Sequence, residues 1–204
     1  MNEQTAGVVY LLDDEEAVLD ALSFLLTSRA LDVRAFSSAA PMLAAVDAAP
    51  RPLAGVFVLD IRMEPMSGLR VFDELLARGL RNPVLFLSGH GDIPMAVDAL
   101  KHGAFDFLEK PYSDNALADR IEQAIAVDSA MHRQDARHLE RQARLASLTD
   151  RESEVMRRVA AGKLNKVIAD ELHVSVRTVE VHRARVYAKL GVHSAAEVAT
   201  WLAA

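Results

Sequence analysis

The first 127 residues alternate short apolar runs with amphipathic stretches, and this alternation restricts the fold more than any other feature. Each apolar run has the length of a buried strand, and each stretch after it has the spacing of a helix that is apolar on one side. The expected strands are Val8–Leu12, Val33–Phe36, Val56–Leu59, Val84–Leu87 and Phe105–Leu108. The expected helices begin near Glu15, Ser38, Gly68, Ile93 and Ser113. Five such units predict an α/β fold, a doubly wound five-stranded parallel sheet covered by helices on both faces.

The segment after the fifth strand predicts one long helix. From Ala116 to about Ser147 neither proline nor glycine interrupts a run that is rich in Ala, Gln, Arg and Glu, and these residues favour helix. We expect the last helix of the first domain to continue as a linker, either as a solvated connector or as a helix that pairs with another. Asp128 and Asp135 interrupt its apolar seam, which argues against a sustained heptad repeat.

Strand signals stop after Leu148, and the tail predicts four helices at about 150–161, 165–172, 176–190 and 195–202. Capping boxes indicate helix starts, and glycines indicate helix ends. The boxes are Thr149 with Glu152 and Ser194 with Glu197, and the glycines are Gly162 and Gly191. The expected organisation is a domain at 1–127, a helical linker at 128–147 and an all-α domain at 148–204.

Composition limits the class of protein and its compartment. The 204 residues are 51% hydrophobic and 25% charged, which is typical of globular domains. The absence of cysteine excludes disulfides and thiolate metal sites and fits a reducing cytoplasm. We expect a soluble cytoplasmic protein with no membrane partner, because no leader pattern and no apolar run of about 18 residues is found. Residues 1–148 carry a net charge of −8 and residues 149–204 carry +2, which favours a nucleic-acid partner for the tail.

Polar side chains follow several expected strands at the point where each strand ends. They are Asp13 and Asp14 after the first strand, Asp60 after the third, Ser88 after the fourth and Lys110 just beyond the fifth. Parallel strands present their carboxyl ends at one edge of a sheet, where α/β proteins bind ligands. Taken singly, each residue has an ordinary explanation as a helix start, a polar loop residue or a surface cation. Their common place at one edge favours a functional site.

Three carboxylates at one edge repel one another unless a cation lies among them. Oxygen ligands without thiols suit Mg²⁺, which would also screen an incoming phosphoryl group. Asp60 is then placed to act as a nucleophile and to become an acyl phosphate. Lys110 would offer a point charge to the phosphoryl oxygens, and the Ser88 hydroxyl would donate a hydrogen bond to them.

The segments LLDDEE, VLDIRMEPMSGL, LFLSGHGDIPMAV and GAFDFLEKP make residues 8–125 resemble the receiver domain of two-component response regulators. The resemblance implies a flavodoxin-like sheet and a phosphoryl group that Asp60 accepts from a sensor histidine kinase. The implied magnesium ligands are Asp13, Asp14, Asp60 and the backbone carbonyl of Arg62. Ser88 and Lys110 would sense the phosphoryl group. Phe107 falls where this family has its switch aromatic, with a buried core phenylalanine as the alternative.

The sequence departs from the family pattern at one position, and it also argues against one rival family. The family usually has proline four residues after the phosphoacceptor, whereas this chain has Glu64 there and Pro65 next. An extra carboxylate beside the pocket would hinder anions or change dephosphorylation unless it points to solvent, which we expect. A phosphatase of the haloacid dehalogenase type requires a second acidic residue two positions after its nucleophile. Arg62 stands at that position, and this argues strongly against the phosphatase.

The helix expected near Val176 has one apolar and one mixed face. A helical wheel places Val179, Val186 and Leu190 inward. The opposite side carries Arg177, Val181, Ala184 and Ala188, flanked by Glu180 and Arg185. A face with small or apolar side chains between basic ones suits a helix that enters the major groove of DNA. The small Ala169 allows the preceding helix to pack closely across it.

Residues 148–202 resemble the LuxR/FixJ-type tetrahelical helix-turn-helix domain, through LTDRESEVMRRVAAGKLNKVIADEL and VSVRTVEVHRARVYAKLGVHS. The resemblance makes 176–190 the recognition helix. Its geometry assigns four residues to base edges, namely Arg177, Glu180, Val181 and Ala184. The candidate phosphate contacts are Lys166, Thr178, His182, Arg183, Arg185 and Lys189. Glu180 would accept from a cytosine amine or face solvent, and His182 is either a contact or a packing residue.

The expected function is that of a phosphorylation-controlled transcriptional regulator of the FixJ/NarL kind, with magnesium as cofactor, and not of an enzyme. Phosphorylation would favour a homodimer that binds paired half-sites on double-stranded DNA, and RNA polymerase is a further candidate partner. Two alternatives stay open: a phosphorylation-independent DNA-binding regulator with a structural receiver, and a receiver that acts mainly as a phosphate sink. A zinc site is not expected at His90, His102, His132 and His138, which we interpret as surface or linker residues.

Overall fold

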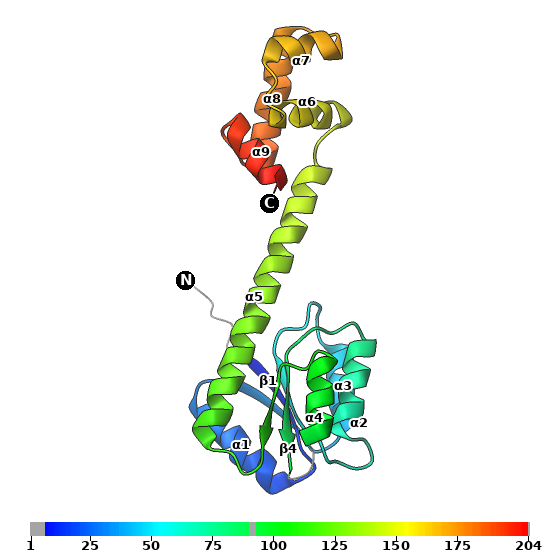
Figure 1. Cartoon of the computed structure of the whole chain (residues 1–204), viewed down its shortest axis with the longest axis vertical. Helices are drawn as coiled ribbons and strands as arrows, with labels where there is room; N and C mark the ends of the chain where they lie inside the picture. The colour runs from blue at the N-terminus through cyan, green and yellow to red at the C-terminus, as the bar shows by residue number, and fades with distance from the viewer. Residues whose placement is uncertain (1–6, 90–92, 204) are drawn as a thin grey trace. The chain divides into compact units, whose positions relative to one another are not determined.

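The computed structural model describes residues 7–89 and 93–203, which belong to two compact units divided between Arg133 and Gln134. Each unit has a hydrophobic core of its own. Figure 1 shows the path of the chain through both units. Within the described ranges, no helix has the length and apolar character that a membrane span requires.

The first unit follows the alternation of strands and helices that the sequence predicts. Its strands are β1 (Val8–Leu12), β2 (Asp32–Phe36), β3 (Val56–Asp60), β4 (Val84–Ser88) and β5 (Asp106–Glu109). Its helices are α1 (Glu16–Ser28), α2 (Ala39–Ala48), α3 (Gly68–Ala77), α4 (Ile93–Lys101) and the first part of α5 (Asp114–Ala146). The strand bounds and helix starts all lie within one residue of the expected positions.

The sheet brings the ends of its central strands to one level. All five strands are parallel, in the order β2-β1-β3-β4-β5. The register aligns Leu12 with Leu59, and Leu59 with Phe86. The residues that follow these positions therefore leave the sheet at the same edge. The strand order reverses between β1 and β3, and doubly wound sheets bind their ligands at such a reversal.

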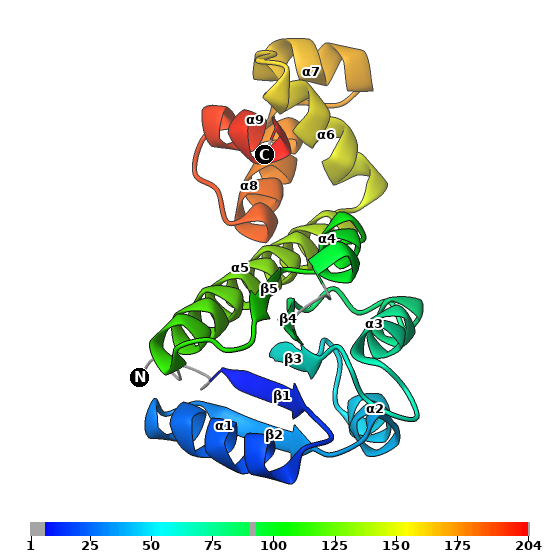
Figure 2. The same cartoon turned by 60° about the horizontal axis from the view of Figure 1, so that its bottom comes forward.

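Helices cover both faces of the sheet, as the burial of its central strands requires. α1 and α5 lie on one face, and α2, α3 and α4 lie on the other (Figures 1 and 2). Successive side chains of a strand point to opposite faces. In β1, Val9 and Leu11 accordingly join the core beneath α1 and α5, whereas Tyr10 and Leu12 join the core beneath α2, α3 and α4.

The prediction of one long helix after the fifth strand is confirmed, because α5 is unbroken over 33 residues. Its inner face continues from Leu117 and Ile121 to Asp128, whose residue is only 6% exposed. The interruption of the apolar seam at Asp128 is thus a buried polar contact. His132 is likewise only partly exposed, with its Nε2 atom 3.0 Å from the carbonyl oxygen of Leu53. Its interpretation as a surface or linker residue is wrong.

The other predicted surface histidines can be placed in part. His102 and His138 are exposed, as expected. His90 lies outside the described residues. Among the residues that the structure describes, no three His, Cys, Asp or Glu side chains form a group that could hold a metal ion by themselves.

The second unit is the expected bundle of four helices, α6 (Asp150–Ala160), α7 (Asn165–Leu172), α8 (Val176–Leu190) and α9 (Ala195–Ala203). Its core gathers one apolar face from each helix, and the predicted inward residues of α8 are all buried there. These residues are Val179, Val186 and Leu190. Ala169 of α7 is buried too, which permits the close packing that its small size predicts.

Local signals define the ends of these helices as predicted. Thr149 and Glu152 form a capping box in which each side chain binds the backbone N–H of the other residue. The Ser194 hydroxyl accepts from the backbone N–H of Glu197 at 3.1 Å. Gly191 ends α8 with a φ of +69°, a left-handed conformation that glycine adopts without a steric cost.

Glu152 also forms an ion pair inside the second unit. Its residue is 3% exposed, and its Oε2 atom lies 2.6 Å from the Lys189 ammonium at the end of α8. Lys189 also donates to the carbonyl oxygen of Ser147 at 2.7 Å. The hydrogen bond from Lys189 is the main reason that the pKa of Glu152 lies below its ordinary value. The capping box of α6 is therefore tied to the last turn of α8.

Replacing Lys189 by methionine leaves the Glu152 carboxylate buried without its cation. We expect the second unit to lose about 2 kcal/mol of unfolding free energy at pH 7, measured by urea unfolding with the fluorescence of Trp201, the only tryptophan of the chain. Because the pKa of Glu152 is lowered in the folded state, this stabilisation is present above the ordinary pKa of glutamate and is lost as the pH falls through the lowered value.

Lys163→Met is the matched control, because Lys163 forms a more exposed ion pair with Glu171. Its loss of unfolding free energy should be clearly smaller than that of Lys189→Met, because solvent screens an exposed pair. The difference in unfolding free energy between Lys189→Met and the wild type should also become smaller in acid. Equal losses for the two variants, or a gap that persists when Glu152 is protonated, would contradict this account of the pair.

Candidate functional sites

The carboxyl edge of the sheet brings Asp13, Asp60 and Lys110 together. The Lys110 Nζ atom lies 2.6 Å from Asp60 Oδ1 and 3.2 Å from Asp13 Oδ2. Asp13 is fully buried, and Asp60 is 6% exposed. One ammonium group is therefore shared between two buried carboxylates that come from neighbouring strands.

Backbone N–H groups fix the other oxygen of each carboxylate. Asp13 Oδ1 accepts from the N–H of Glu15 at 2.9 Å, at the residue that caps α1. Asp60 Oδ2 accepts from the N–H of Arg62 at 2.7 Å, in the turn after β3. The two carboxylates are thus oriented by their own turns before any ligand binds. Such preorganisation is what a site for a charged group requires.

The charges at this edge are strongly coupled. Burial raises the pKa of Asp60, and the hydrogen bond and charge of Lys110 act in the opposite direction. Burial alone would lower the pKa of Lys110, but its bond to Asp60 and the charges of both aspartates outweigh this effect and raise it. Lys110 is therefore a permanent cation. Two carboxylates and one ammonium leave one net negative charge.

The other predicted residues of this edge occupy three kinds of position. Ser88 is fully buried at the end of β4, and its hydroxyl lies 3.3 Å from the carbonyl oxygen of Leu108. Phe107 on β5 is partly buried against the core beneath α2, α3 and α4, so it is neither a free surface residue nor a fully buried one. Asp14 and Glu64 are exposed.

The donor set fits a magnesium ion. Mg²⁺ in proteins keeps several waters and takes one or two carboxylates, with oxygen as its only ligand type. Asp13 and Asp60 supply two adjacent carboxylates, and their excess negative charge over Lys110 matches a cation. The sequence predicts three converging carboxylates, but the structure draws only these two together around Lys110 and leaves Asp14 facing solvent. Asp14 and the carbonyl of Arg62 stay candidate ligands.

Gly68 is a positioning residue of this edge that the sequence analysis treated only as a helix start. It opens α3, and its N–H donates to the carbonyl oxygen of Ile61 at 3.1 Å. A Cβ atom at this position would lie 2.1 Å from the carbonyl oxygen of Asp60. Only glycine lets α3 begin this close to the end of β3. In the sequence, this role is indicated by the Ser67-Gly68 pair at the start of the helix.

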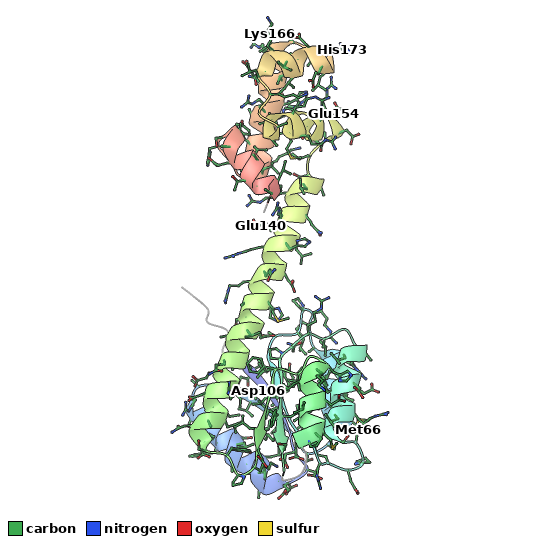
Figure 3. The ribbon with its side chains drawn as sticks, viewed as in Figure 1. Met66, Asp106, Glu140, Glu154, Lys166 and His173 are labelled. Carbon is green, nitrogen blue, oxygen red and sulfur yellow. The ribbon has the colours of Figure 1, made fainter. Side chains whose placement is uncertain are left out.

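A second candidate site is the exposed face of α8 in the other unit. All four predicted base-contacting residues are exposed there, and Val181 is 45% exposed although it is apolar. These residues are Arg177, Glu180, Val181 and Ala184. Arg185 is exposed beside them, and Lys166 is exposed on α7, where Figure 3 labels it. An exposed strip of this composition suits the edges of bases in a major groove.

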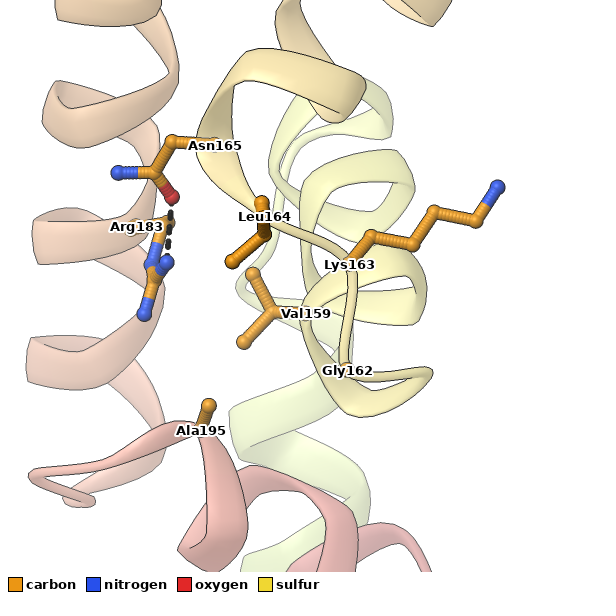
Figure 4. Close-up of a pocket in the computed structure, with 7 residues that line it drawn as sticks. All are labelled: Val159, Gly162, Lys163, Leu164, Asn165, Arg183 and Ala195. Atoms are coloured by element: carbon orange, nitrogen blue, oxygen red, sulfur yellow. Dashed lines mark hydrogen bonds between the residues drawn. The ribbon is translucent and has the colours of Figure 1, made fainter.

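Three predicted phosphate contacts are instead held by the protein itself, and a fourth, His182, is partly buried. Thr178 contacts the hydroxyl of Ser175, and Lys189 is bound to Glu152. Arg183 donates to Asn165 and to the hydroxyl of Tyr187, beside a pocket of about 470 Å³ formed by α6, α7, α8 and α9 (Figure 4). His182 is partly buried, and its Nδ1 atom has no hydrogen-bond partner in the described structure.

Comparisons with known proteins agree with both halves of this description. Residues 9–122 match the family model of the response regulator receiver domain, and residues 146–202 match that of the bacterial regulatory proteins of the luxR family. The C4-dicarboxylate transport transcriptional regulatory protein DctR of Rhodobacter capsulatus is 45% identical over 94% of this chain and 96% of its own length. The transcriptional regulatory protein FixJ of Bradyrhizobium diazoefficiens is 41% identical over 95% and 93%.

Two solved structures extend over nearly the whole chain. The response regulator StyR superposes with a TM-score of 0.90 at 35% identity, covering 98% of this chain and 99% of that one. Full-length FixJ from B. japonicum gives a TM-score of 0.62 at 38% identity, covering 98% and 97%. The relatives named here are regulators rather than enzymes. The chain therefore belongs to the two-component response regulators that join a receiver domain to a LuxR-type DNA-binding domain.

Proposed function

We propose that this response regulator binds DNA under the control of phosphorylation at Asp60, with a sensor histidine kinase as the phosphoryl donor. The observation that carries the proposal is the shared ammonium of Lys110 between Asp60 and Asp13. In this arrangement the Asp60 carboxylate stands at the end of a strand, is oriented by its own turn and lies beside a fixed cation. A carboxylate in these surroundings is suited to nucleophilic attack on phosphorus.

In the proposed transfer, an oxygen of Asp60 forms a bond to phosphorus while the bond between phosphorus and the histidine nitrogen of the kinase breaks. The histidine nitrogen leaves with the electron pair of that bond and takes a proton from solvent, and Asp60 becomes an acyl phosphate. Lys110 then pairs with phosphoryl oxygens, and the Ser88 hydroxyl leaves the carbonyl of Leu108 to donate to one of them. Asp13, Asp14, Asp60 and the carbonyl of Arg62 would hold Mg²⁺, which offsets the negative charge of the phosphoryl group.

The response to phosphorylation is proposed to pass through the face made by α4, β5 and α5. The shift of Ser88 is accompanied by an inward rotation of Phe107, which is now only partly buried. Val97 and Lys101 are exposed on this face, and Asp106 is paired with Arg120 at 3.1 Å. Rearrangement there favours a homodimer that binds paired half-sites on double-stranded DNA.

The DNA contacts follow from the exposed face of α8. Arg177, Glu180, Val181 and Ala184 are assigned to base edges, and Lys166 and Arg185 to phosphates. The internal bonds of Arg183 and Lys189 favour roles in packing the unit.

DNA binding also implies a cytoplasmic location, and RNA polymerase is a further proposed partner. We propose a receiver, a linker and a DNA-binding domain near 1–127, 128–147 and 148–204, with the start of the linker segment, as far as His132, packed on the receiver.

Replacing Asp60 by asparagine should abolish covalent phosphorylation by acetyl phosphate and Mg²⁺, because the amide is no nucleophile toward phosphorus. Electrospray mass spectrometry of the intact protein measures the phosphoryl adduct directly. Asp73→Asn is the matched control, since Asp73 is an exposed aspartate on α3 and should leave labelling unchanged. Undiminished labelling of Asp60→Asn would overturn the assignment of the acceptor. Labelling that leaves DNA affinity and oligomeric state unchanged would instead favour a constitutive regulator.

Replacing Arg177 by alanine should weaken binding to a duplex selected from a random pool by about 1–3 kcal/mol and relax the preference for one base. Fluorescence anisotropy at fixed salt measures the affinity for the selected duplex and for its single-base variants. Arg157→Ala is the control, because Arg157 is an exposed arginine of α6 outside the proposed interface. If both variants lose affinity equally, Arg177 acts through overall charge alone and the base assignment fails.

A further inference from the structure

We propose that Asp128, His132 and Asn82 form a polar clamp that holds α5 on the receiver as far as His132 and thereby sets where the connector to the DNA-binding domain begins. The receiver match ends at residue 122, so both α5 residues of the clamp lie beyond it. Asn82 belongs to the segment before β4. The clamp lies at the amino edge of the sheet, away from the phosphorylation site.

The polar clamp satisfies the backbone of a buried loop. Leu53 and Gly55, just before β3, are both buried. The N–H of Gly55 donates to Asp128 Oδ2 at 2.9 Å, and the carbonyl oxygen of Leu53 accepts from His132 Nε2 at 3.0 Å. Buried backbone groups need partners, and here side chains of α5 supply them. Without such partners, these buried backbone groups would be left unsatisfied, which destabilises a loop.

Asn82 joins the loop to the helix. Its Nδ2 atom lies 2.7 Å from the carbonyl oxygen of Leu53, 2.9 Å from that of Gly55 and 3.1 Å from Asp128 Oδ1. Three acceptors around one atom identify it as the amide nitrogen, whose two hydrogens are shared among them. Because a carbonyl oxygen only accepts, the Nε2 atom of His132 carries a proton. Every polar contact of the clamp therefore runs from a donor to an acceptor.

Asp128 is the centre of the clamp. It accepts from Gly55 and Asn82, and the His132 Nε2 atom lies 3.4 Å from its Oδ1 atom. Burial raises the pKa of Asp128, and the bond from Gly55 and the charge of His132 oppose this effect. Burial of a carboxylate on a surface helix is unfavourable by itself. Here its hydrogen-bond partners compensate for that burial. The side chain of Asp135, two turns further along, is exposed and has no comparable surroundings.

The polar clamp also involves the segments that lead into the two strands of the proposed signalling site. Gly55 directly precedes β3, which ends at Asp60, and Asn82 lies just before β4, which ends at Ser88. A helix that is fixed to the amino ends of these strands moves with them, whereas a released helix frays. This consequence for signalling rests on the proposed function. The anchoring of the helix does not.

Hydrogen exchange on the full-length chain tests the anchoring. In Asp128→Ala, amides of residues 125–133 should exchange at least tenfold faster than in the wild type, whereas Asp135→Ala should stay within twofold. Exchange in Asp128→Ala within twofold of the wild type would overturn the clamp. If Asp128→Ala does not fold, His132→Leu removes the bond to Leu53 and the contact with Asp128 but leaves the bonds of Gly55 and Asn82, and at least threefold faster exchange near residue 132 is then expected. No change in that variant would equally overturn the proposal.

A second measurement separates the clamp from the proposed function. Beryllofluoride with Mg²⁺ mimics the phosphoryl group and should raise the duplex affinity of the wild type, and Asp128→Ala should lose at least fivefold of that stimulation while acetyl phosphate still labels Asp60. Full stimulation in Asp128→Ala would exclude a signalling role for the clamp. Absence of labelling in the wild type would refute the proposed function instead, and the exchange result would still decide the anchoring.

Discussion

The repulsion between Asp13 and Asp60, relieved by the shared ammonium of Lys110, is the interaction around which the receiver is arranged. Two buried carboxylates on adjacent strands are unfavourable together, since each disfavours the ionised form of the other. The parallel register nevertheless forces them to the same level of the sheet. The arrangement is stable only with a cation between them, and Lys110 reaches that place from the segment after β5. The negative charge that is left over attracts a divalent cation, and such a cation would in turn screen a phosphoryl group.

Two residues around this edge have properties that serve the site rather than local stability. Gly68 has no side chain because α3 starts against the carbonyl of Asp60. Ser88 is a fully buried hydroxyl whose bond to Leu108 is long at 3.3 Å, so it is readily exchanged for a better acceptor. In the second unit the opposite holds, because the buried charge of Glu152 is matched directly by Lys189. Buried charge is thus incompletely compensated at the carboxyl edge of the sheet and closely paired in the second unit.

The fold and the composition of the main site could be predicted from the sequence because both depend on local patterns. Strand length, helix spacing and the residues at strand ends are all read from residues that are close together in the chain. The sequence motifs of the family include these residues. What could not be predicted depends on distant pairs. Asp128 meets Gly55 across 73 positions, and Lys189 meets Glu152 across 37. The helical wheel distinguishes inward from outward residues on α8, but it cannot show that Arg183 and Lys189 are occupied by partners on other elements.

The same reasoning explains how α5 remains helical where nothing covers it. Residues 133–140 are all exposed, and an isolated helix of two turns is unstable in water. Its turns must therefore be propagated from anchored segments on both sides. On the receiver side that anchor is the polar clamp at Asp128. In the second unit, Arg144 donates to the carbonyl oxygen of Leu190 at 2.6 Å and Arg141 lies over the Trp201 ring at 4.8 Å. The connector itself is thus a short exposed stretch. It stays helical because α5 is anchored on each side by contacts within the receiver and within the DNA-binding unit.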